Sequence, residues 1–221
     1  MRVDAFSRSD VCTLVGSLGT AAKDTSFRKR QIIYSAGDAS DSIFLIKVGS
    51  IKLTVLSAEG NEAVTSILKS GELLGPEALD VVPSPRVTNA VALTNVRAAR
   101  VARSTMLDLV LSDPTICLLF ISSLIRRITV LQDGLAQNLL YNSEQRLART
   151  LASLARFAET NKQQDTPSFS QQELASMIGA TRQRVNVLLK QFRKLGYIDD
   201  PRGRHVNSSL REITGADLGH G

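Results

Sequence analysis

Three hydrophobic patterns follow one another along the chain. Between residues 31 and 101, short apolar segments alternate with turn signals. Ile51, Leu53 and Val55 recur at every second position, as in a half-buried strand, and 43–48 is a more continuous apolar run of strand length. Glycine-containing turns separate these segments. The pattern predicts a β-sandwich or β-roll, and we assign it to a first domain over 1–113.

A different spacing begins at Pro114, a residue suited to the first turn of a helix. Apolar side chains then recur at alternating intervals of three and four, which predicts one helix over 114–140 with a heptad seam. The seam residues are Leu118, Ile121, Ile125, Ile128, Gln132, Leu135 and Leu139. Leu124 and Leu131 lie beside the seam. Because two apolar faces require two partners, we expect a dimerisation helix, with burial inside its own domain as the alternative.

Charge is concentrated in the C-terminal part of the chain. The protein has 221 residues, 43% hydrophobic and 22% charged, which is typical of a globular protein and excludes disorder. Of the net charge of +6, residues 1–140 carry +2 and residues 141–221 carry +4. The segment 182–194 holds five basic residues and no acidic residue. Such a patch favours nucleic acid as a partner, and a solvated helix face is the alternative.

The segment 170–194 carries the signals of two short helices joined by a tight turn. Ser170 and Glu173 form a predicted capping box, and Gly179 suits a left-handed helix end. Thr181 can cap a second helix. The apolar positions expected to face inward are Leu174, Ala175, Ile178, Val185, Leu188, Leu189 and Phe192. Helix, glycine turn and helix together predict a helix-turn-helix within a third domain over 141–221.

The second helix presents side chains that can read DNA. Arginine can bond guanine twice, whereas glutamine and asparagine favour adenine. The candidate DNA-binding residues of this helix are Thr181, Arg182, Gln183, Arg184, Asn186 and Lys190. Residues 199–204 predict a hairpin wing whose Arg202 and Arg204 can contact phosphates. Double-stranded DNA is therefore the expected partner.

These motifs together resemble the Crp/Fnr family of bacterial transcription regulators. The resemblance rests on Gly37-Asp38, Phe44–Ile46, Gly49–Lys52, Gly71–Leu73 and Arg86 in the first domain, and on 170–198 in the third. It implies an α+β fold with a cyclic-nucleotide-binding-type β-roll, a long dimerisation helix and a C-terminal winged helix-turn-helix. It also implies a homodimer on a roughly palindromic operator, with RNA polymerase as a further partner.

The resemblance also suggests where an effector would bind. In cyclic-nucleotide-binding members a Gly-Glu pair opens a short helical cassette that ends in an arginine followed by a hydroxyl residue. The glutamate accepts from the ribose, and the arginine pairs with the cyclic phosphate. The corresponding residues here are Gly71, Glu72, Arg86, Thr88 in place of Val87, and Gln132 on the long helix. The alternative is that Glu72 and Arg86 form an ion pair within the β-roll.

Other chemistry has little support in the sequence. Cys12, Cys117, His205 and His220 give no metal-ligand spacing, so we expect no metal site, haem or iron–sulfur cluster. No catalytic constellation is present, and we expect no enzyme. No apolar run is expected to span a bilayer, which indicates a cytoplasmic protein without a membrane partner. A cyclic-nucleotide-binding regulatory subunit that acts on a protein partner is the alternative function.

Overall fold

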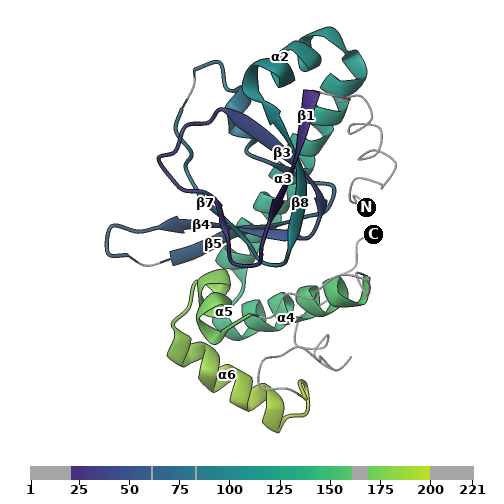
Figure 1. Cartoon of the computed structure of the whole chain (residues 1–221). Coiled ribbons are helices and arrows are strands. Elements are labelled where there is room, and N and C mark those ends of the chain that lie inside the picture. The colour runs from purple at the N-terminus through teal and green to yellow at the C-terminus, as the bar shows by residue number, and fades with distance from the viewer. Residues whose placement is uncertain (1–20, 61, 83, 161–168, 200–221) are drawn as a thin grey trace. The chain divides into compact units, whose positions relative to one another are not determined.

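The α+β architecture expected from the sequence is confirmed (Figure 1). The structure is a computed structural model that describes residues 21–60, 62–82, 84–160 and 169–199. The strands and the short 3-10 helix η2 are β1 (Ala22–Phe27), β2 (Ile32–Tyr34), β3 (Ser42–Val48), β4 (Ser50–Leu56), β5 (Glu62–Lys69), β6 (Leu73–Leu74), η2 (Pro76–Leu79), β7 (Asn89–Ala92) and β8 (Val96–Ala102). The helices are α2 (Arg103–Ser112), α3 (Pro114–Leu140), α4 (Ser143–Thr160), α5 (Gln171–Ile178) and α6 (Arg182–Lys194).

Two four-stranded sheets form the β-roll. Their strand orders are β1-β8-β3-β6 and β2-β7-β4-β5. Strand β8 is central to the first sheet because it pairs antiparallel with both β1 and β3, with Val101 opposite Ala22 on one side and Ile43 on the other. Strand β1 lies outside the region 31–101 in which strands were predicted, since most of its residues are polar and none is fully buried.

The apolar run of β3 reflects burial on both faces of its strand. Ile43 and Leu45 pack in one core with Met106 of α2 and Phe120 of α3. Phe44 and Ile46 point the other way and pack in a second core with residues of β4, β7 and β8. Successive side chains of a strand alternate between faces, so a strand with a core on each side loses its polar positions.

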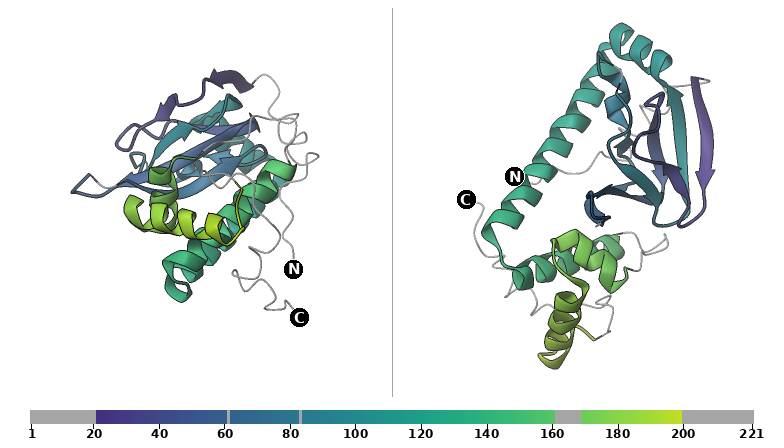
Figure 2. Two further views of the ribbon diagram at one scale, coloured as in Figure 1. Left: turned by 90° about the horizontal axis from the view of Figure 1, so that it is seen from below. Right: turned by 90° about the vertical axis from the view of Figure 1, so that its left-hand side faces the viewer.

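Helix α3 has the predicted bounds and runs unbroken from its start beside α2 (Figure 2). The chain divides into two compact units, and the boundary lies between Val130 and Leu131, inside this helix. Helix α4 starts at Ser143. The backbone amide of Gln145 donates to Asn142 Oδ1, and the amide of Asn142 donates to Gln145 Oε1, which is a capping box that extends the helix.

The turn between β3 and β4 requires glycine. Gly49 has φ +95°, and a Cβ there would lie 2.9 Å from Thr94 Oγ1 and 3.0 Å from Val96 Cα, in addition to meeting the carbonyl of Asn95. Gly60, in the next hairpin, has φ +80° but open space around it. The two positions share a strained backbone and differ in the room for a side chain.

We therefore expect Gly49→Ala to destabilise the protein much more than Gly60→Ala. Gly60→Ala has only the left-handed backbone against it, about 1 kcal/mol. Gly49→Ala adds a clash with backbone atoms, worth roughly a further 1–3 kcal/mol. Urea denaturation of both variants measures the difference. Equal losses of unfolding free energy would contradict this account of the β3–β4 turn.

Candidate nucleic-acid interface and effector pocket

The helix-turn-helix forms as its sequence signals predict. The Ser170 hydroxyl accepts from the backbone amide of Glu173, whose side chain bonds back to the Ser170 amide, so the capping box is confirmed. Helix α5 ends at Gly179 with φ 60°, and the amide of Ala180 then bonds to the carbonyl of Ala175. The Thr181 hydroxyl accepts from Arg184 N and caps α6. The turn between α5 and α6 is therefore fixed by local interactions at both helix ends.

All the apolar positions predicted to face inward are buried. Helix α6 buries Val185, Leu188, Leu189 and Phe192, and α5 buries Leu174, Ala175 and Ile178. Arg146 of α4, which sequence analysis did not single out, donates from Nε to the carbonyl of Ile178 and from Nη1 to that of Tyr141. This cation neutralises the negative end of α5 and holds α4 against the two-helix motif.

The exposed face of α6 differs in part from the predicted one. Arg182, Gln183 and Lys190 are exposed, as are Thr181 and Arg184. Arg184, however, donates from Nε to Ser143 Oγ at 3.2 Å, and half-buried Asn186 accepts from Gln171 at 3.5 Å. The expectation that Asn186 is exposed is therefore wrong, because it packs between the two helices.

One exposed residue of α6 was missed. Val187 is 55% exposed and stands four residues after Gln183 and three before Lys190, so these residues share one helix face opposite the buried stripe. It was not among the candidates because it is apolar, although helical spacing places it opposite the predicted stripe. Lys194 continues the same face at the C-terminal end of α6. Arg202 and Arg204 of the predicted wing lie outside the described residues.

The predicted seam of α3 is exposed along its length. Within the described residues of the single chain, its apolar members are between 44% and 75% exposed, and Gln132 is exposed with them. Ile116, Phe120 and Leu124 occupy another face of the helix and pack into the core of the β-roll. The helix therefore has one apolar face that is buried in its own unit and one that is not.

By length and composition alone, α3 is apolar enough to cross a membrane, with a mean hydropathy of 1.6 over an 18-residue window of which 11% is buried. The expectation that no segment of the chain is long and apolar enough to span a bilayer is therefore wrong. The helix carries Arg126 and Arg127 near its midpoint, where a bilayer penalises each charge by about 2.5–3.5 kcal/mol. Its first turns also pack into the β-roll core. Both observations favour a partner helix over lipid.

Arg86 is the most buried charged group of the described β-roll, with 3% of its surface exposed. Its Nη1 donates to Glu77 Oε1 at 2.9 Å and to the Gly75 carbonyl at 3.3 Å, and its Nη2 donates to the Ser42 carbonyl. The guanidinium also lies 4.4 Å from the ring centre of Tyr34. An ion pair inside the β-roll is thus present for Arg86, but its partner is Glu77.

Thr88 and Tyr34 extend this cluster. The Thr88 side chain hydrogen-bonds Tyr34, and burial, followed by the charge of Glu77, raises the pKa of Tyr34 to about 12. The phenol therefore stays neutral at any physiological pH. Thr88 stands two residues after Arg86, and its side chain bonds Tyr34 within this cluster.

The short helix does not open at Gly71-Glu72, as the sequence analysis expected, but four residues later. The turn at Gly71 leads into strand β6, and the short helix η2 begins after Gly75, which is its N-cap with φ 80°. The residue that follows the helix-opening glycine is Pro76. Glu72 instead accepts from the Lys69 amide at 2.6 Å. Burial raises the pKa of Glu72, although the charges of Arg126 and Arg127 oppose this shift.

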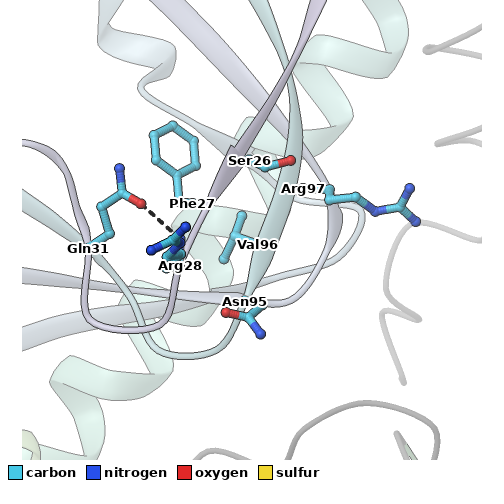
Figure 3. A pocket seen from close by; sticks show the side chains of 7 residues that line it. All are labelled: Ser26, Phe27, Arg28, Gln31, Asn95, Val96 and Arg97. Carbon is cyan, nitrogen blue, oxygen red and sulfur yellow. Dashed lines mark hydrogen bonds between the residues drawn. The ribbon is translucent and has the colours of Figure 1, made fainter.

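Two concave regions mark the described surface of the β-roll. One, of about 600 Å³, lies over Tyr34, Phe44, Arg86 and Arg100. The other, of about 590 Å³, lies where β1 ends and β8 begins (Figure 3). There Gln31 accepts from the Arg28 amide, and the side chain of Arg97 points away from this pair. Polar groups do not converge in this second region, and no group of possible metal ligands occurs among the described residues.

Comparison with known families assigns both halves of the chain. Residues 24–113 match the family described as "Cyclic nucleotide-binding domain", and residues 145–210 match "Crp-like helix-turn-helix domain". The CRP-like cAMP-activated global transcriptional regulator of Mycobacterium tuberculosis is 26% identical over 187 residues, 83% of either chain. The anaerobic regulatory protein of Haemophilus influenzae is 26% identical over 203 residues, 86% of this chain and 76% of that protein.

Solved structures share the fold. The c-di-GMP-responsive global regulator CLP of Xanthomonas campestris superposes with a TM-score of 0.76 at 20% identity, over 88% of this chain and 97% of its own. A transcriptional regulator of the Crp/Fnr family from Eubacterium rectale gives a TM-score of 0.75 at 14% identity, over 92% and 94%. At these identities the likeness concerns the fold alone.

Proposed function

Because the chain belongs to the Crp/Fnr family of bacterial transcription regulators, we propose that it acts as a homodimer that binds a roughly palindromic DNA operator in the cytoplasm. It is a regulator with a Crp-like helix-turn-helix domain. The observation that carries the proposal is the exposed face of α6, which presents basic and polar side chains on a helix held by caps at both sides of the turn. RNA polymerase is the further partner that the family implies.

The residues of α6 divide into base readers and phosphate contacts. Arg182 and Gln183 stand in the first turn, where a recognition helix reaches base edges, and Arg182 favours guanine and Gln183 adenine. Val187, on the same face as Gln183, suits the methyl group of thymine. Lys190 and Lys194 lie further along and suit phosphates. Arg184 and Asn186 have partners within the unit and serve first to position α6.

The exposed seam of α3 supports the homodimer. Six apolar side chains on one face, at heptad spacing, match the stripe that a second copy of the same helix covers. Gln132 in the seam would fix the register of the pair. Two copies of α6 would then address two half-sites about 34 Å apart, one turn of DNA. A regulatory subunit that acts on a protein partner is not favoured, because it leaves the basic face of α6 without a role.

Operator recognition tests the role of α6. An operator selected from random DNA by the purified protein is titrated by fluorescence anisotropy. Arg182→Ala should weaken operator binding by about 1–3 kcal/mol and relax the base preference at one position. Lys194→Ala should weaken binding to all sequences and lower the salt slope by about 1.

Lys23→Ala is the matched control, because Lys23 is an exposed cation on β1 of the β-roll. We expect it to leave operator affinity unchanged. A loss with Lys23→Ala as large as that with Lys194→Ala would contradict an interface on α6. An equal loss on every sequence with Arg182→Ala would reassign Arg182 to phosphate contact.

A charge in the seam tests the dimer. Ile125→Glu should yield a monomer in sedimentation velocity, because the two-fold axis brings like charges together in an apolar interface. Val130→Glu is the control, since Val130 is 63% exposed on the same helix but stands roughly 140° away around it. If both variants remain dimers, the seam is not the dimer interface. If both become monomers, the substitutions have damaged α3 in general.

A further inference from the structure

Residues 24–113 match a family described as a cyclic nucleotide-binding domain. A cyclic nucleotide would need suitable partners among the residues around Arg86. A cyclic phosphate needs a cation with donors to spare, and a ribose hydroxyl needs an acceptor close by. The residues around Arg86 do not meet either need.

Both terminal nitrogens of Arg86 are already engaged inside the protein. The terminal nitrogens bond to one carboxylate and two backbone carbonyls, and the side chain is only 2% exposed. The remaining Nε is buried, with no hydrogen-bond partner among the described residues. A phosphate would therefore have to displace Glu77, which lies 2.9 Å from Nη1.

Charge leads to the same conclusion. Glu77 neutralises Arg86, whose side chain is 2% exposed. In the interior of a protein, charges interact more strongly than they do in water. A phosphate brought to Arg86 would meet the carboxylate at hydrogen-bond distance, and two anions on one buried cation repel each other. The Glu77 side chain is 28% exposed and that of Arg86 is 2% exposed, so solvent reaches the carboxylate of this pair more than the guanidinium.

The other groups that the family resemblance implies for a cyclic-nucleotide site are also missing or engaged elsewhere. Pro76 follows the glycine that opens η2, so this position offers neither a carboxylate nor an amide hydrogen. The Gly75 carbonyl accepts from Ala78 N and from Arg86. Thr88, the nearest hydroxyl after Arg86, bonds Tyr34. Each group that would contact a cyclic nucleotide has been replaced or has an internal partner.

We propose that the Glu77 carboxylate fills the anion site of the β-roll in place of a ligand phosphate, so that Arg86 does not take a cyclic nucleotide. Glu77 holds η2 against β3 and β2 through Arg86, which is the work that a bound phosphate would do. Gly75 is part of this device, because any side chain there would press on the guanidinium, 3.0 Å from Cζ.

Thermal unfolding with and without nucleotide tests the proposal. The full-length protein, Glu77→Gln and Glu72→Gln are melted with cAMP, cGMP, cyclic di-GMP and inorganic phosphate over a concentration series. We expect no shift in Tm with any nucleotide for the wild type or for Glu72→Gln, the matched control with a carboxylate that does not bond Arg86. Glu77→Gln should gain an anion-binding site at Arg86, and its Tm should rise by about 5 °C or more at saturating phosphate or cAMP.

The double variant Arg86→Gln with Glu77→Gln keeps the proposal testable if Glu77→Gln alone does not fold. It removes both charges together, so it should fold and gain no affinity for anions. A saturable rise in the Tm of the wild type that the double variant lacks would overturn the proposal. A folded Glu77→Gln that gains no anion affinity would overturn it as well. Nucleotide binding kept by the double variant would uphold it, because Arg86 is then not the anchor. None of these readouts depends on DNA binding.

Discussion

The β-roll is organised around one buried guanidinium that must find its counter-charge inside the protein. Arg86 joins η2 through Glu77 and Gly75, β3 through the Ser42 carbonyl and β2 through the ring of Tyr34. A buried cation without its partner destabilises a fold by about 3–5 kcal/mol, so these elements can keep their places only together. The left-handed Gly75 follows from the same constraint, since a side chain there would occupy the space of the guanidinium.

Function follows from what this arrangement leaves exposed. The β-roll satisfies its own cation, α3 buries one face in the core and exposes another, and the second unit presents α6 on a framework fixed by caps and by Arg146. Each exposed surface has a different chemistry: an apolar heptad stripe suits a second copy of the chain, and a basic polar helix suits DNA. The match of residues 145–210 to a Crp-like helix-turn-helix domain agrees with the second assignment.

Sequence reasoning succeeded where the determining interactions are local. The capping box of α5, the glycine that ends it and the buried stripe of α6 lie within a few residues of one another. The length of α3 follows from its periodicity alone. Strand β3 was recognisable from the more continuous apolar run at 43–48, although its burial on both faces was not predicted.

It failed where a partner lies far away in the chain or where two motifs look alike. Gly71-Glu72 and Gly75-Pro76-Glu77 are both glycine followed closely by glutamate, and only the start of η2 distinguishes them. The position of Asn186 depends on Gln171, fifteen residues earlier, and that of Arg184 on Ser143, forty-one residues earlier. Val187 was missed for another reason: only polar residues of α6 were considered as DNA contacts, although Val187 lies opposite the predicted stripe.

The most direct test is the affinity of the wild-type protein for its selected operator across a cAMP series from zero to 1 mM. An internal carboxylate replaces the ligand phosphate at Arg86, and the measurement also rests on the proposed DNA binding. We predict strong specific binding without nucleotide and a dissociation constant that stays within about two-fold across the series. Specific binding that arises only with cAMP, saturates as the nucleotide does and is lost in the Arg86→Gln, Glu77→Gln double variant would contradict the replacement of the ligand phosphate.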